Sequence, residues 1–248
     1  MESHLRVAEA ATALAVGRPI VLVDDENPDS DGELVLAAQL ATADTVGFLV
    51  RYGSGFIRVA VNLETCLRMQ LPPMVTHWSD AASSNEPLYS FSVAVDASSG
   101  ITTGISATDR ARTLRILADP SSSPDDVRRP GHVQVIKTHP RGVRGRFCAA
   151  DAAFDLTRIA GLAPAAALCT LVSVDDPTQM ARAHELVDFA TDHDLCTLSI
   201  GDIRTYCSAG GGEPLAGPRP LPKLDRPVTQ PFPSTRLRMS RDLPRCFP

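Results

Sequence analysis

Carboxylate side chains crowd one short stretch near the start of the chain. Residues 24 to 33, Asp-Asp-Glu-Asn-Pro-Asp-Ser-Asp-Gly-Glu, hold six acidic groups among ten residues. Carboxylates in one small volume repel each other, and this repulsion favours a divalent cation such as Mg²⁺ or Mn²⁺, or another cationic ligand. Because Pro28 and Gly32 interrupt regular structure, the acids are predicted to lie on a loop. The alternative is a solvated, acid-rich turn that binds nothing.

Two flanking segments are predicted to hold this loop. Residues 20–23, Ile-Val-Leu-Val, form a short, β-branched apolar run that predicts a buried strand. Residues 34–41 combine helical spacing with good helix formers and predict a helix. A loop between a buried strand and a helix keeps its carboxylates close together.

Strands and helices alternate through the rest of the chain up to residue 207. Further helices are predicted over 2–16, 44–52, 63–69, 107–119, 150–162 and 178–193, and strands over 57–61, 91–95, 131–138, 165–174 and 196–203, the last leading into a short helix. A mobile loop is predicted at 77–87 and a linker at 120–130. The pattern predicts one layered α/β or α+β domain over 1–207, with helices packed against a mixed sheet. Residues 208–248 are rich in Pro and Gly and predict an extended tail, either a linker remnant or a partner-binding arm.

Composition excludes several classes of function. The chain has 248 residues, 44% of them hydrophobic, and a formal net charge of −5. This charge argues against nucleic-acid binding, which needs a basic surplus to neutralise phosphates. No apolar run approaches the roughly 20 residues that span a bilayer, so no membrane association is expected. The six cysteines form no CxxC pair or zinc spacing, which favours reduced thiols in a cytoplasmic protein.

Three motifs in register resemble one enzyme family. They are Val-Asp-Asp-Glu-Asn-Pro-Asp-Ser-Asp-Gly-Glu-Leu at 23–34, Asp-Ala…Thr-Thr-Gly-Ile-Ser-Ala-Thr-Asp-Arg-Ala within 96–111, and Arg-Arg-Pro-Gly-His-Val at 128–133. Their order and spacing, over roughly residues 5 to 206, resemble 3,4-dihydroxy-2-butanone-4-phosphate synthase. The resemblance implies that family's fold, a homodimer with sites near the subunit interface, and Mg²⁺ at the acidic loop. It also implies that the chain converts ribulose 5-phosphate into a four-carbon riboflavin precursor and formate.

The acidic loop departs from the family pattern while it keeps its charges. The family has Arg-Glu-Asn-Glu-Gly-Asp where this chain has residues 28–33, Pro-Asp-Ser-Asp-Gly-Glu. By this resemblance the metal-binding Glu corresponds to Asp29, the second Glu to Asp31, and the substrate-binding Asp to Glu33. Pro28 cannot replace the cationic contact of the family's Arg.

Other positions lose groups on which the family depends. The family's Gly-His-Thr-Glu aligns with Cys-Ala-Ala-Asp at 148–151, so that Ala149 stands where a His binds metal. Thr170 stands at the position of a catalytic Glu, and Arg58 at that of a Cys. His132 matches an essential His, and Arg146 matches a phosphate contact. Loss of the ligand His together with the Glu is expected to abolish the usual reaction, since even an outer-shell loss costs about 10–100-fold.

The candidate site follows from these matches. We expect catalytic roles for His132, Asp29 and Asp31, substrate contacts from Glu33, Thr103, Arg146, Arg58 and Asp151, and a metal ion, if one is bound, at Asp29 and Asp31. Purely structural alternatives stay open: a structural role for His132, a turn at 102–106 held by local hydrogen bonds, and an Arg146 that pairs only with Asp151 or solvent. Arg58 is either exposed or supplies the cation missing at Pro28.

The leading hypothesis is a divergent enzyme of this family. It would carry out lyase or isomerase chemistry linked to enolisation on a sugar phosphate or a related polar carbonyl compound, with His132 as the acid–base group. Such an enzyme would contribute to a specialised product outside riboflavin synthesis. Neighbouring genes from another biosynthetic cluster would point to that product. The alternatives are the ordinary riboflavin reaction, a metal-free enzyme that uses His132 and Arg58, or a non-catalytic paralogue that binds a ligand or a partner.

Overall fold

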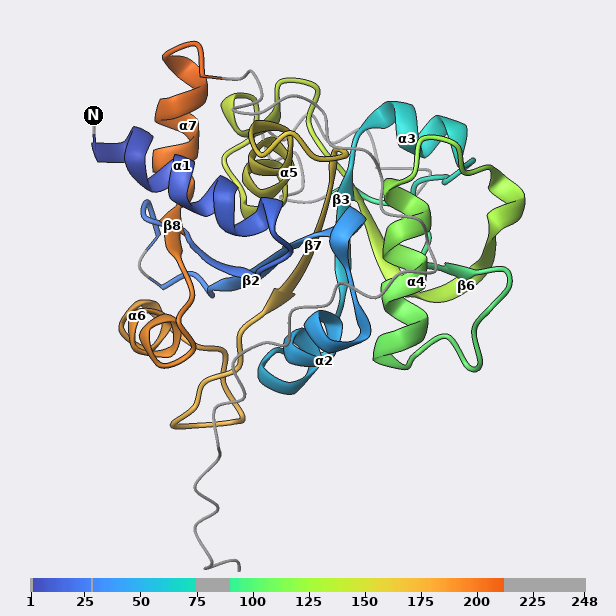
Figure 1. Ribbon diagram of the computed structural model, residues 1–248, viewed down its shortest axis with the longest axis horizontal. Helices are drawn as coiled ribbons and strands as arrows, with labels where there is room; N and C mark the ends of the chain where they lie inside the picture. Colours follow the sequence, from blue (N-terminus) through green and yellow to red (C-terminus); the bar gives the residue numbers. More distant parts are fainter. Residues whose placement is uncertain (1, 28, 75–89, 212–248) are drawn as a thin grey trace, which may run out of the picture.

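The computed structural model describes residues 2–27, 29–74 and 90–211. One mixed sheet organises them, in the order β4-β6-β3-β7-β2-β1-β8, with β5 paired to β6 (Figure 1). The strands are β1 (Ile20–Val23), β2 (Glu33–Ala37), β3 (Arg58–Val61), β4 (Ser90–Phe91), β5 (Val95–Ala97), β6 (Val127–Lys137), β7 (Ala165–Thr170) and β8 (Thr197–Ser199). The β3–β6 and β1–β8 pairs are parallel, and the remaining pairs are antiparallel.

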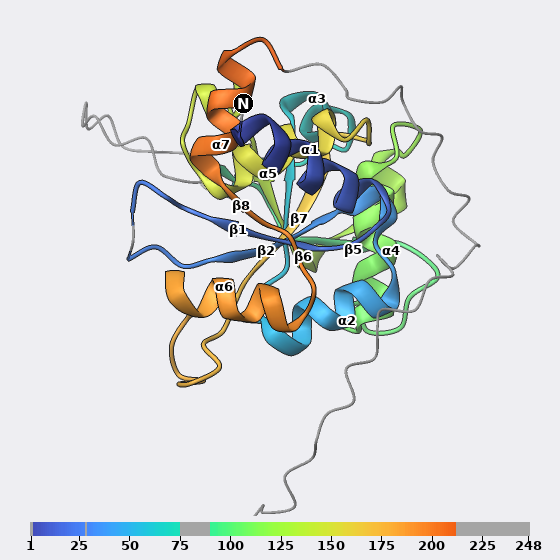
Figure 2. The ribbon, with the colours of Figure 1, turned by 60° about the vertical axis from the view of Figure 1, so that its left-hand side comes forward.

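Helices cover both faces of the sheet (Figure 2). They are α1 (Glu2–Ala15), α2 (Ala43–Tyr52), α3 (Leu63–Arg68), α4 (Ala107–Ala118), α5 (Ala149–Ile159), α6 (Ala183–Asp192) and α7 (Ile200–Ser208). Side chains of α1, α5 and α7 share one apolar core with one face of the strands, while those of α2, α4 and α6 share another core with the opposite face. This confirms the expected layered α/β fold.

Side-chain alternation along the strands assigns the polar positions to a face. Val35 of β2, Ala60 of β3 and Leu168 of β7 all belong to the core under α1, α5 and α7. Side chains two residues apart on a strand point to the same face. Glu33, Arg58 and Thr170 therefore lie on that face as well, and one edge of the sheet presents a row of polar groups among apolar neighbours.

The helix predicted over residues 34–41 is wrong. The chain there forms β2, followed by a short 3-10 turn at Ala38–Leu40. Its neighbours on the two sides are β1 and β7, so that every residue of β2 is buried on one face or the other. After Glu33 such an enclosed strand is apolar at every position and lacks the alternation that would distinguish it from a helix.

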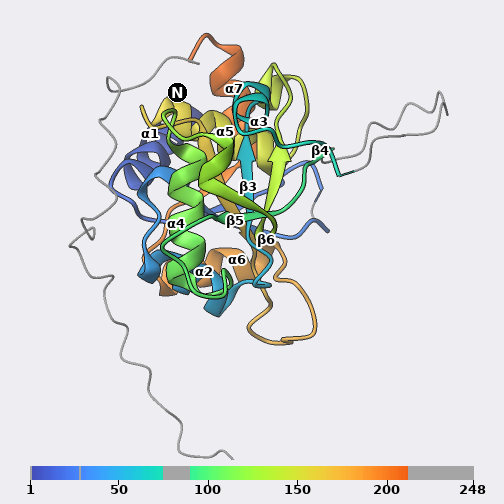
Figure 3. The same ribbon diagram turned by 90° about the vertical axis from the view of Figure 1, so that its right-hand side faces the viewer.

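Smaller differences concern the limits of elements. The strand expected at 91–95 divides into β4 and β5, which both pair with β6, a strand that already begins at Val127 inside the expected linker (Figure 3). The helix expected over 178–193 begins only at Ala183. The loop at 77–87 and nearly all of the tail at 208–248 lie outside the described residues, so the division at residue 207 stays a prediction. No described helix is long and apolar enough to cross a bilayer.

Candidate active site

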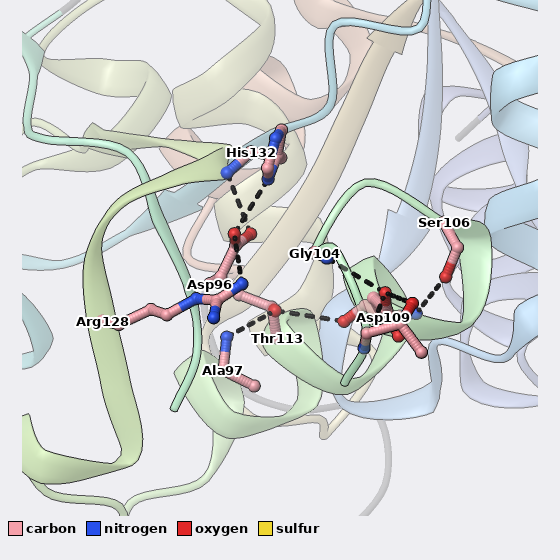
Figure 4. Close-up of polar contacts among 9 residues, drawn as sticks. Asp96, Ala97, Gly104, Ser106, Asp109, Thr113, Arg128 and His132 are labelled. Carbon is pink, nitrogen blue, oxygen red and sulfur yellow. Dashed lines mark hydrogen bonds and ion pairs between the residues drawn. The ribbon is translucent and has the colours of Figure 1, made fainter. Parts of the chain in front are cut away.

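His132 is held by a buried carboxylate on the neighbouring strand (Figure 4). Its backbone N–H donates to Oδ1 of Asp96 at 2.9 Å, and its ring Nδ1 lies 2.8 Å from Oδ2 of the same residue. An ionised carboxylate can only accept, so Nδ1 carries the proton. The Asp96 side chain is 2% exposed and that of His132 is 41% exposed, so the ring also faces solvent. This arrangement orients an imidazole for proton transfer at its other nitrogen.

The loop between β5 and α4 packs directly against this pair. Gly104 has a φ of +92°, and a Cβ there would lie 2.1 Å from Oδ2 of Asp96 and 2.9 Å from Nδ1 of His132. A side chain at this position would therefore displace the carboxylate from the imidazole. Arg128 completes the surroundings, with a guanidinium nitrogen 3.7 Å from Oδ2 of Asp96.

The same loop is fixed from its other side by Asp109. One of its carboxylate oxygens accepts hydrogen bonds from the Thr102 backbone N–H and hydroxyl and from the Gly104 N–H, at 3.2, 2.9 and 3.0 Å. Although burial acts in the opposite direction, these bonds hold the pKa of Asp109 below its usual value. Ser106 caps α4 through the Asp109 N–H. The local hydrogen bonds expected of a turn at 102–106 are present, and Thr103 lies exposed within that turn, so a substrate contact from Thr103 stays a prediction.

Buried Glu33 and Arg58 and the partly buried Thr170 form a polar row across β2, β3 and β7. One guanidinium nitrogen of Arg58 lies 2.6 Å from each Glu33 oxygen and 2.8 Å from the Thr170 hydroxyl, which donates to Glu33 at 3.1 Å. Burial raises the pKa of the Glu33 carboxyl, while Arg58 and Thr170 oppose that shift by favouring the charged form. Arg58 is thus buried rather than exposed, and its charge is engaged by Glu33.

Arg146 pairs with Asp151, as its structural alternative predicted. Its Nε donates to Asp151 at 2.5 Å and another nitrogen donates to the Lys137 carbonyl at 3.0 Å. The fully buried Asp151 also accepts from the His139 N–H at 2.6 Å and from the Cys148 thiol at 2.9 Å. Burial and the adjacent carboxylate raise the pKa of Cys148 to about 12. Asp151 therefore ties the turn after β6 to the start of α5.

The acidic loop turns outward in the described structure. Asp29 and Asp31 are exposed, and Asp29 lies 3.3 Å from Arg182. Asp24 accepts hydrogen bonds from the next turn of its own loop, and Asp25 accepts from the Gly201 N–H in the first turn of α7. These contacts stabilise the loop itself.

The strand register relates these groups to one another. Arg58 lies opposite Gln134 on β6, two residues after His132 and three before Lys137. At about 3.3 Å per residue, His132 and the carbonyl that holds Arg146 are about 17 Å apart along β6. Glu33 is three strands away from β6, or about 14 Å at the usual strand spacing. The predicted residues thus fall into separate groups around His132, Arg58, Arg146 and Asp29, and the carbonyl that holds Arg146 lies toward the opposite end of β6 from His132.

A family model described as 3,4-dihydroxy-2-butanone 4-phosphate synthase matches residues 8–206. The chain belongs to the 3,4-dihydroxy-2-butanone 4-phosphate synthase family. Its relatives include the riboflavin biosynthesis proteins RibBA of Salinispora tropica, 44% identical over 200 residues, and of Nocardia farcinica, 45% identical over 197 residues. These alignments cover 81% and 79% of this chain but 48% and 46% of the relatives, so the match spans about half of their length.

Solved structures of synthases agree with this assignment. The Candida albicans 3,4-dihydroxy-2-butanone 4-phosphate synthase shares 34% identity at a TM-score of 0.74, over 81% of this chain and 96% of that one. A synthase crystallised with two magnesium ions shares 32% identity at the same TM-score, over 84% of this chain and 98% of that one. The expected fold type is therefore confirmed.

The groups present do not fit a divalent ion in their described arrangement. Within residues 2–27, 29–74 and 90–211, no group of three or more His, Cys, Asp or Glu side chains is arranged to hold a metal. Mg²⁺ takes oxygen ligands in near-octahedral geometry. Glu33 instead binds Arg58, and Asp29 lies beside Arg182.

Sequence reasoning missed the residues that position the candidates. Asp96 and Asp109 hold His132 and the neighbouring loop, and both belong to the motif at 96–111, where only Thr103 was expected to contact the substrate. Asp96, between Val95 and Ala97 on a strand, carried the signal, because a buried acid among apolar residues needs a partner. Its partner His132 could not be found without the register of β5 against β6, whereas the partners of Asp109 lie within its own motif.

Proposed function

We propose that this member of the synthase family catalyses proton transfer on a phosphorylated sugar or a related polar carbonyl compound, as part of lyase or isomerase chemistry linked to enolisation. The His132–Asp96 pair carries the proposal. A buried carboxylate fixes one imidazole nitrogen, and the ring is exposed enough to reach a substrate. A histidine imidazole can take a proton from the carbon next to a ketone and return it elsewhere.

The substrate class rests on family membership and on the cations nearby. The relatives are named for riboflavin biosynthesis, and the matching structures for 3,4-dihydroxy-2-butanone 4-phosphate synthase. Arg146 is the predicted phosphate contact; its Nε donates to Asp151 and a second nitrogen to the Lys137 carbonyl, so an anion would be bound through the third nitrogen. Thr103 and Asp151 are the further predicted substrate contacts. Mg²⁺ or Mn²⁺ at Asp29 and Asp31 also stays a prediction, which titration of the protein and an Asp29→Asn/Asp31→Asn variant would test.

The ordinary synthase reaction is the second candidate, and the comparisons favour it. Identity of 44% to a riboflavin biosynthesis protein is high for a changed reaction. Against it stand Ala149 and Thr170, at the positions where resemblance expects a metal-binding His and a catalytic Glu. Incubation with ribulose 5-phosphate and Mg²⁺, followed by detection of formate, separates the two. Rapid release of formate would establish the ordinary reaction and make our expectation of altered chemistry wrong.

Proton transfer is measured separately from carbon–carbon cleavage. In D₂O, NMR follows deuterium uptake next to the carbonyl of ribulose 5-phosphate and of other pentose and tetrose phosphates. We expect exchange that His132→Gln lowers by about 10²–10⁴-fold, the usual contribution of a general acid or base. The exposed His184 on α6 supplies the matched control, His184→Gln, with no loss. Unchanged exchange in His132→Gln would contradict the proposal, and no exchange with any of these substrates would favour a non-catalytic binding role.

A further inference from the structure

A cavity of about 820 Å³ lies at the opposite end of β3 from Arg58. It opens where β3 and β6 end, at Asn62 and Thr138, and where the chain enters β7, at Pro164. The surrounding elements α3, α5 and β3 meet in the upper part of Figures 1 and 3. Arg58 and Asn62 are four residues apart, about 13 Å along the strand. None of His132, Glu33 and Arg58 lines this cavity.

The cavity has the size and composition of a small-molecule site. Ligand pockets usually measure about 300–1,000 Å³, with mostly apolar walls and a few convergent polar groups. Leu117 of α4, Phe154 of α5 and Leu162 supply apolar surface here. The carboxyl ends of a parallel strand pair such as β3–β6 are also the usual place for ligands in α/β sheets.

One polar group in the wall is buried without a partner. Gln39 is 2% exposed, and its Oε1 accepts from the Ala163 N–H at 2.6 Å, which fixes the orientation of the amide. Its Nε2 then has no hydrogen-bond partner among the described residues. Buried donors are normally satisfied, and an unsatisfied one is costly. Nε2 itself has almost no accessible surface, so an acceptor atom of a ligand in the cavity would satisfy it once the Gln39 amide turns toward the cavity.

Charges in the wall favour an anion. Arg68 and Arg158 both line the cavity, together with one carboxylate, Glu64. Arg68 donates to the Ser122 carbonyl, so this contact leaves its charge uncompensated. Arg158 lies 3.3 Å from Asp155, and its side chain is half exposed. The wall therefore holds two guanidinium groups and one carboxylate, and Asp155 behind the wall partly offsets the charge of Arg158.

We propose that this cavity binds a small amphipathic anion, with an apolar or aromatic body between the α4 and α5 walls, an acceptor atom for Gln39 Nε2, and its negative group beside Arg68 and Arg158. His132, Glu33 and Arg58 do not line this cavity, while its wall residue His139 contacts Asp151, one of the predicted substrate contacts. Its ligand class differs from a sugar phosphate because the walls are largely apolar. It would bind whether or not the proposed proton transfer occurs.

A fluorescent probe tests this directly on the full chain. 8-Anilinonaphthalene-1-sulfonate is an aromatic anion that brightens in apolar surroundings, and N-phenyl-1-naphthylamine is the same ring system without the sulfonate. We expect one saturable site for the anion and at least tenfold weaker binding of the neutral compound. Arg68→Gln/Arg158→Gln should weaken the anion about tenfold or more. Arg51→Gln, which removes the same charge from an exposed position on α2, should have no effect.

Further variants and a folding measurement distinguish a loss of binding from a loss of folding. Gln39→Glu keeps the acceptor for Ala163 but replaces the unpartnered donor with a negative charge, so we expect weaker binding of the sulfonate. Thermal unfolding by circular dichroism shows whether each variant remains folded. His132→Gln should bind the probe like the wild type. Equal binding of both compounds, no loss in the double arginine variant, or titration without saturation would each overturn the proposal.

Discussion

At the scale of single residues, the Glu33–Arg58 pair makes the sharpest prediction. Both side chains are about 7% exposed or less, and Arg58 contacts both carboxylate oxygens. Arg58→Leu would leave a buried carboxylate without its counter-charge, which costs about 3–5 kcal/mol. We expect a loss of that size in the free energy of unfolding at pH 7, measured by urea denaturation.

The matched control removes both charges together. Glu33→Leu/Arg58→Leu should recover most of the stability, because well-packed apolar residues replace buried ion pairs at little cost. The pH dependence has a definite sign. The pKa of Glu33 is raised by burial in the folded state, so the Arg58→Leu protein binds a proton more readily when folded. Its deficit should therefore shrink as the pH falls from 7 towards 5, and a deficit independent of pH would contradict this account.

The Cys148 thiol is expected to be inert in the folded protein. Burial and Asp151 raise its pKa to about 12, and only the thiolate attacks alkylating reagents. Iodoacetamide at pH 8 should therefore label Cys148 only after unfolding in urea, as peptide mass spectrometry would show. Rapid labelling of the native protein would mean that the contact with Asp151 opens readily in solution.

Residue types along the chain revealed part of this site. The sequence marked His132, Arg146 and Glu33 through their resemblance to family positions, and each lies in a well-defined polar contact. It could not reveal that Arg58 and Glu33 neutralise each other. Their contact depends on β7, more than a hundred residues later, which lies between the two strands. Whether these residues act in catalysis stays a prediction.

At the scale of elements, the loop before α4 controls the position of His132. Gly104→Ala would place a methyl group against Asp96 and add backbone strain at a positive φ. Gly210 has the same φ of +92°, and a Cβ there would have no neighbour within 4 Å, so Gly210→Ala carries only the strain. We expect Gly104→Ala to lose clearly more stability than the control and to impair deuterium exchange. Equal losses of stability in the two variants would show that the loop does not pack against the His132–Asp96 pair.

Apolar, β-branched runs and helical periodicity made β1, β3 and α5 predictable although most of their residues are buried. The amphipathic α1 also follows from local pattern. β2 does not, because β1 and β7 enclose it and helices cover both faces, so its residues show neither period. The early start of β6 was also missed, because the charged residues at its beginning face solvent although they pair with β5.

At the scale of the whole molecule, the homodimer implied by the family resemblance stays a prediction. Light scattering after size-exclusion chromatography would give twice the chain mass of 26.5 kDa for a dimer. We expect this mass at micromolar concentration. A single-chain mass there would mean that any catalysis is completed within one subunit, and would contradict the expected site near an interface.

The polar row across β2, β7 and β3 also bears on how the sheet assembles. If β7 were to slip by one residue against β2, Thr170 would leave the layer that contains Glu33, and apolar side chains would reverse faces. Glu33 and Arg58 would then be buried apart from each other, each among apolar side chains. A wrong strand register is therefore more unfavourable than it would be if all three positions were apolar. The Glu33→Leu/Arg58→Leu chain should refold through more species with a wrong register, even if its final stability is unchanged.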